Sequence, residues 1–222
     1  MDDVKFLKKE AIAFGWEKAI GNIGYFIGLL IILIATSMLP QILGAAFAKV
    51  KILALIIALA AVALQVEVKL GMIKSMLIFA DGKKPAMGEL FSCFDKRIVT
   101  IFVASLLYGV MVFLGTLLLI VPGIILAIKF IYFSYFIVDK NAGIMESFKM
   151  SSALTDGSKT NIFLLTLLLW LINAAGALCL GIGLIITLPL SMITVAYVYR
   201  KLEAGSAVVE AQAAPQVEAQ VV

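Results

Sequence analysis

Residues 119–160 read LIVPGIILAIKFIYFSYFIVDKNAGIMESFKMSSALTDGSKT, and this stretch decides the fold. Pro122 and Gly123 predict a tight corner between two apolar helices, because these residue types interrupt helices. The helix that returns from the corner carries a single charge, Lys129. An amphipathic helix follows and ends at an Asp-Gly pair. The pattern predicts an all-α chain of apolar helices joined by short turns.

Charged residues are few in this chain and unevenly spread. Hydrophobic residues make up 63% of the sequence and charged residues 14%, against about 45–50% and about 25% in soluble domains. No charge occurs in residues 19–48, 98–128 or 160–199. As one helix, the last run would be about 60 Å long, about twice the hydrocarbon core of a bilayer, so it must fold back. The sequence therefore predicts an integral membrane protein.

The predicted fold is an all-α, polytopic membrane helix bundle of about six transmembrane helices within residues 19–202. Gly181 and Gly183 predict the turn between the last two helices, and Pro189 predicts a kink in the final one. The predicted spans are 19–39, 52–66, 98–121, 124–138, 161–178 and 184–199.

Three segments outside these spans have an amphipathic pattern. We expect residues 1–18, about 85–96 and about 142–155 to form helices that lie in the membrane interface. Asn141 is the expected N-cap of the third helix. Residues 203–222 are low in complexity and free of aromatic side chains. This composition predicts a flexible tail.

The basic residues indicate how the chain is oriented. In the six-span arrangement, fifteen of the 18 Lys and Arg residues fall on one side of the membrane, while Lys49 and Lys51 fall on the other. Such a bias is typical of cytoplasmic loops. We therefore expect a multi-pass protein of a prokaryotic cytoplasmic membrane with both termini in the cytoplasm.

Catalytic constellations are missing from the sequence. There is no histidine, and Cys93 and Cys179 are far apart, so neither zinc sites of the His type nor His-based acid–base chemistry is predicted. Ser151, Ser152 and Thr155 are nucleophilic residue types, but no histidine can activate them. We expect no enzyme, no catalytic residue, no metal and no cofactor.

Three polar residues within apolar segments are candidates for an intramembrane polar site: Lys129, Glu67 and Asn173. Lys129 either extends to the nearer interface or acts inside the membrane, paired with Glu67 or contacting a lipid phosphate or an anionic substrate. For Asn173, a hydrogen bond between helices is the favoured interpretation over a binding site.

Basic residues flank the short segment 85–96. Lys83, Lys84, Lys96 and Arg97 are candidates for contacts with anionic lipid head groups, each worth about 1 kcal/mol near the surface. The positive net charge of +4 follows from membrane topology, so no nucleic-acid partner is expected.

Four segments resemble a broad group of six-helix prokaryotic membrane proteins of uncharacterised function: FGWEKAIGN, IVPGIILAIKF, SYFIVDKNAGIMESFKMSSALTDGSKTNIF and GIGLIITLPLSMITVAYVYRKL. The group includes the membrane domain attached to some glycerophosphodiester phosphodiesterases. The resemblance covers nearly all of residues 10–202 and implies the six-helix architecture. It implies no hydrolysis, because the phosphodiesterase catalytic domain is not part of it. The matching positions are Pro122, Gly123, Lys129, Ser152, Gly157, Pro189 and Tyr199.

These features favour a non-enzymatic membrane component that interacts with membrane lipids, anionic ones included, or with other membrane proteins. A small transporter or channel that uses Lys129 and Glu67 is the main alternative. A membrane-embedded enzyme acting on lipids is a third hypothesis, based on Asp139, Glu146 and Asp156 at the interface. The sequence predicts no oligomeric state.

Overall fold

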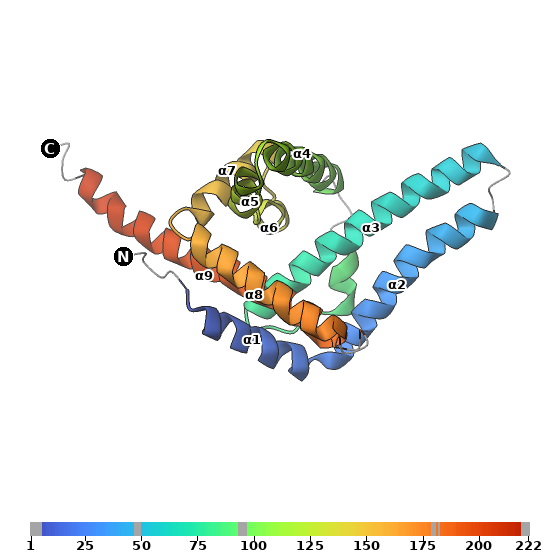
Figure 1. Cartoon of the computed structure of the whole chain (residues 1–222), viewed down its shortest axis with the longest axis horizontal. Coiled ribbons are helices and arrows are strands. Elements are labelled where there is room, and N and C mark those ends of the chain that lie inside the picture. Colours follow the sequence, from blue (N-terminus) through green and yellow to red (C-terminus); the bar gives the residue numbers. More distant parts are fainter. Residues whose placement is uncertain (1–5, 47–49, 93–96, 179–180, 182, 219–222) are drawn as a thin grey trace.

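A computed structural model describes residues 6–46, 50–92, 97–178, 181 and 183–218. Helices account for all the regular secondary structure of this part of the chain, as the sequence predicts. Figure 1 shows α2 and α3 running side by side away from the other helices, while α4 to α7 gather on the opposite side of α3. The elements are α1 (Lys8–Gly21), α2 (Ile23–Ala46), α3 (Lys51–Ala80), the 3₁₀ helix η1 (Met87–Phe91), α4 (Arg97–Leu118), α5 (Ile120–Lys129), α6 (Phe133–Lys140), α7 (Ile144–Thr155), α8 (Lys159–Leu178) and α9 (Leu184–Glu218).

Five helical stretches in the described part of the chain are long and apolar enough to cross a membrane. This finding supports a membrane protein. The predicted span over 52–66 lies in α3, which is not one of the five, so the count of six stays a prediction, as does the orientation of the termini. The five stretches are Ile23–Leu43, Arg97–Leu118, Ile120–Lys140, Lys159–Leu178 and Leu184–Ser206.

The corner of the central hairpin lies earlier than Pro122 and Gly123, where the sequence predicts it. Leu119 is the extended residue between α4 and α5, and Pro122 falls in the first turn of α5, where its missing N–H costs little. A Cβ atom on Gly123 would lie 2.1 Å from Oγ1 of Thr116 and 2.8 Å from its Cα. The absence of a side chain at Gly123 therefore allows α5 to pack closely on α4.

The second hairpin joins α8 to α9. Gly181 has a φ of +76°, a left-handed conformation that glycine adopts without strain, so it supplies the predicted turn. A Cβ atom on Gly183 would lie 2.6 Å from Cα of Gly176 in α8. Pro189 is buried inside α9. Close approach of α8 and α9 therefore depends on two facing glycines, as is common between membrane helices.

The N-terminal helix packs on α9, as Figure 1 shows. Ala11, Gly15 and Ala19 form its buried face, and their spacing of four residues places them on one stripe. Oγ1 of Thr194 donates a hydrogen bond to the carbonyl oxygen of Ala11 at 3.3 Å. The structure thus begins this helix at Lys8, ends it at Gly21, and packs it against the last helix of the chain.

In the described part of the predicted interfacial helix over 85–96, residues 85–92, the structure has a short 3₁₀ helix, Met87–Phe91. Residues 93–96 lie outside the described residues. Leu90 of the 3₁₀ helix is fully buried against Gly71 of α3, where a Cβ atom would lie 2.1 Å from the Leu90 carbonyl oxygen. Lys74 pairs with Glu89 at 2.7 Å, and its hydrogen bond lowers the pKa of that carboxyl group. Packing on α3 therefore holds this segment.

The predicted helix over 142–155 is present as α7, Ile144–Thr155. Asn141 is not its N-cap, which is a correction to the sequence analysis: Asn141 ends α6 in a left-handed conformation with a φ of 54°. Gly143 is the N-cap, and its N–H donates to Oε2 of Glu146 at 3.2 Å. Asparagine tolerates both roles, so the residue type alone does not separate them.

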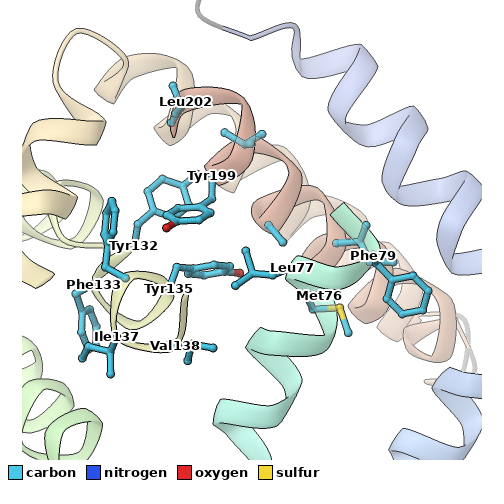
Figure 2. Packing of buried hydrophobic residues seen from close by; sticks show 14 of the residues in the cluster. Met76, Leu77, Phe79, Tyr132, Phe133, Tyr135, Ile137, Val138, Tyr199 and Leu202 are labelled. Carbon is cyan, nitrogen blue, oxygen red and sulfur yellow. The ribbon is translucent and has the colours of Figure 1, made fainter. Parts of the chain in front are cut away.

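Aromatic side chains fill the core between α6 and α9. Figure 2 shows Tyr132 and Tyr135 facing Tyr199, with Leu77 of α3 close by. The ring centroids of Tyr135 and Tyr199 are 5.3 Å apart, a separation typical of favourable aromatic pairs. This contact packs α6 against α9.

A cluster of charges lies next to this core. Arg200 of α9 pairs with Asp81, at the end of α3, and with Asp139 of α6, both at 2.8 Å. Lys140 pairs with Glu203 at 2.6 Å. Because Arg200 contacts carboxylates from two other elements, the cluster fixes the ends of α3 and α6 to α9.

The structure places residues 203–218 in α9. Whether this segment is flexible, as its composition predicts, stays a prediction. The remaining residues of the predicted tail, 219–222, lie outside the described residues.

Replacing Gly15 by leucine should destabilise the chain by about 1–3 kcal/mol, since overpacking has this effect. A Cβ atom there would lie 2.8 Å from the backbone oxygen of Leu190, so the backbone of α9 would have to move. Unfolding by sodium dodecyl sulfate, followed by circular dichroism, measures the change. Gly24→Leu is the control, because no neighbour lies within 4 Å of its Cβ position. Equal stabilities of the two variants would contradict the packing of α1 on α9.

Candidate functional site

Lys129 ends α5 and lines a cavity of about 580 Å³ bordered by α4, α5, α7 and the start of α8. Lys149 of α7 and Lys159 of α8 line the same cavity. The ammonium group of Lys129 lies 5.4 Å from the ring centroid of Phe130, within the range of a cation–π contact. Three lysine residues from three helices thus line one cavity, which we call the lysine pocket.

The rest of the lysine pocket combines one acid with an apolar wall. Asp156 is the only acidic residue among the described residues that line it, and it pairs with Lys159 at 2.7 Å. The side chains therefore leave a net of two positive charges. Leu107, Met111, Met145 and Phe148 supply the apolar surface. A pocket of this kind suits a ligand with an anionic part and an apolar part.

Two hydroxyl groups of α7 hold the backbone next to Lys129. Ser151 Oγ and Thr155 Oγ1 donate to the carbonyl oxygen of Lys129 at 3.0 Å and 3.2 Å. The N–H of Tyr132 donates to Ser151 Oγ at 3.2 Å. These bonds satisfy the carbonyl oxygen of Lys129 and the N–H of Tyr132, which lie between the end of α5 and the start of α6. Ser151 and Thr155 therefore have a structural role.

Glu67, the predicted partner of Lys129, lies elsewhere. It is fully buried in α3 and does not line the lysine pocket. The lysine pocket therefore does not contain both of the residues on which the transport hypothesis depends.

Asn173 links two helices, in line with the favoured interpretation. Its Nδ2 donates to Oγ of Ser191 at 2.8 Å, which joins α8 to α9. Its Oδ1 is buried and accepts no hydrogen bond from the described residues. Neither Asn173 nor Ser191 lines the lysine pocket, so this pair is a separate feature of the second hairpin.

Three of the four predicted head-group contacts, Lys83, Lys84 and Arg97, lie within the described residues. Lys83 and Lys84 are exposed after α3. Arg97 begins α4 and donates from Nη1 to the carbonyl oxygen of Val138 at 3.5 Å. Lys96 lies outside the described residues. Among the described members of this set, none lines the lysine pocket.

Sequence reasoning missed Lys149 and Lys159 as site residues. The pocket-lining residues of α7 and its C-cap lie on one helical face, because successive sequence positions differ alternately by three and by one. These residues are Met145, Phe148, Lys149, Ser152, Ala153 and Asp156. This face was not assigned to a site from the sequence. No group of three metal-ligating side chains occurs among the described residues.

Ser151→Ala should lower the free energy of unfolding by about 1–3 kcal/mol, because it leaves the buried N–H of Tyr132 without its partner. Ser37→Ala is the matched control. Its exposed hydroxyl group donates only to Ile34 in its own helix, and the loss should stay within about 0.5 kcal/mol. Denaturation in detergent compares the two variants, and equal small losses would refute the role given to Ser151.

Comparisons with known proteins give relatives but no activity. Uncharacterised proteins of Mycobacterium bovis and of two Mycobacterium tuberculosis strains are 30% identical to the chain over 148 residues. The match covers 66% of this chain and 45% of each relative, so the chain spans less than half of their length. No family model matches, and no solved structure matches significantly. The resemblance to the membrane domain of glycerophosphodiester phosphodiesterases stays a prediction. The comparisons show that the chain is similar to uncharacterised mycobacterial proteins.

Proposed function

We propose that this chain is a non-enzymatic, multi-pass component of a prokaryotic cytoplasmic membrane that binds anionic lipids through the lysine pocket. The convergence of Lys129, Lys149 and Lys159 on one cavity carries this proposal. Each basic residue near an anionic membrane surface contributes about 1 kcal/mol to lipid binding.

The lining of the pocket supports a lipid over a small soluble anion. Met145 and Phe148 border the pocket beside the ammonium groups, and Met145 is 65% exposed. An apolar surface of this kind next to lysines suits a head group that continues into hydrocarbon. Lysine side chains can place their methylene groups against such a surface while their charges face a phosphate.

The charge bias along the chain supports the cytoplasmic leaflet as the source of the lipid. Lys149 and Lys159 belong to the fifteen basic residues on the predicted cytoplasmic side. That leaflet carries the anionic lipids that attract basic segments next to membrane helices. The proposed orientation, with both termini in the cytoplasm, therefore agrees with the proposed ligand.

Replacing Lys129, Lys149 and Lys159 together by glutamine should weaken binding of phosphatidylglycerol by about 100-fold, since three contributions of about 1 kcal/mol are lost. Native mass spectrometry of the protein from phosphatidylcholine nanodiscs with added phosphatidylglycerol measures the bound lipid.

The matched control replaces Lys8, Lys9 and Lys18 by glutamine. These side chains belong to α1, lie outside the pocket and carry the same total charge. The control should keep most of the binding. Equal losses in both triple variants would show that general charge attracts the lipid, and the proposed pocket would be rejected.

A further inference from the structure

A second cavity adjoins the lysine pocket. It measures about 320 Å³ and lies between α5 and the start of α8. Lys159 lines both cavities. The remaining lining is almost entirely apolar and includes Ile124, Ile125 and Phe163. We call this cavity the α5–α8 groove.

The residues of α5 that line the groove form one helical face. Val121, Ile124, Ile125 and Ile128 follow the spacing i, i+3, i+4, i+7, which places them in a single row. Ile125 is 49% exposed and Val121 is 65% exposed. The row thus offers a continuous apolar strip whose one charged border is Lys159.

We propose that one acyl chain of the bound anionic lipid lies in the α5–α8 groove while its phosphate is held in the lysine pocket, with Lys159 between the two parts. This inference rests on the proposed function and names the ligand class as a lipid with a phosphate head group and at least one long acyl chain. The positive charge of Lys159 at one end of the groove complements a phosphate, and the apolar lining suits an acyl chain. Both features favour an anionic lipid as the occupant.

Contact of an acyl chain with the groove makes one demand on the ligand. The phosphate and the chain must be joined covalently, because the two cavities share a single border residue. Glycerol 3-phosphate has the same phosphate chemistry without the chain, so it would lose the contacts with α5 and Phe163. Burial of each methylene group adds to affinity, and a lipid should therefore bind far more tightly than this soluble analogue.

The test uses the full chain in phosphatidylcholine nanodiscs. Phosphatidylglycerol with a diazirine group on one acyl chain is the probe, and phosphatidylcholine with the same group measures nonspecific labelling. After irradiation and digestion, the ratio of anionic to neutral adducts should be highest on residues 121–128 and 160–163. Unlabelled phosphatidylglycerol should compete with the probe, whereas glycerol 3-phosphate at the same concentration should not.

Ile125→Trp fills the groove and should lower this adduct ratio at least about fivefold, because several methylene contacts are lost. Phe163→Ala, which removes one wall without adding bulk, should lower it as well. Leu171→Trp is the control, since Leu171 is exposed on α8 but does not line the groove. It should leave the ratio unchanged.

The experiments distinguish failure of the groove inference from failure of the proposed function. If the triple lysine variant loses phosphatidylglycerol while Ile125→Trp and Phe163→Ala keep the adduct ratio, the groove is not the chain site and only this inference is overturned. If the triple lysine variant keeps its phosphatidylglycerol, the proposed function fails too. Equal competition by glycerol 3-phosphate would identify a soluble phosphate compound as the ligand and would also overturn the inference.

Discussion

The hydrogen bonds from Ser151 and Thr155 to the carbonyl oxygen of Lys129 hold the centre of this structure together. The helix interrupted between α5 and α6 leaves backbone groups without intrahelical partners. Within a membrane such groups are costly unless protein atoms satisfy them. The hydroxyl groups of α7 do so, and α7 must therefore lie directly against the break. Its polar residues thereby come to border the same cavity as Lys129.

The large features of the fold follow from the sequence because they depend on local composition. Charge-free runs predict apolar helices, and the amphipathic pattern over 142–155 predicts α7 to within two residues. Details set by packing were not predictable in this way. Proline is compatible both with a corner and with a first helical turn, so Pro122 alone could not reveal that Leu119 is the turning residue. The face of α1 that packs on α9 is lined by small residues, whereas hydrophobic periodicity highlights larger ones.

The candidate site was only partly predictable for a similar reason. Lys129 is conspicuous because it stands alone in an apolar segment, and its charge suggested an acidic partner such as Glu67. The structure instead groups Lys129 with two further lysines and a single acid. No pairing rule along the sequence identifies such a group, since its members come from three helices.

The docking of α1 on α9 has a consequence for biosynthesis. Thr194 and Ala11, which join these helices, are 183 residues apart. At a synthesis rate of about 5–20 residues per second, α1 waits about 10–40 s before its partner segment is made. During this time its alanine and glycine stripe has no helix to pack against. This helix is thus made long before it can reach its final position, and a chaperone or the membrane surface must accommodate it in the interval.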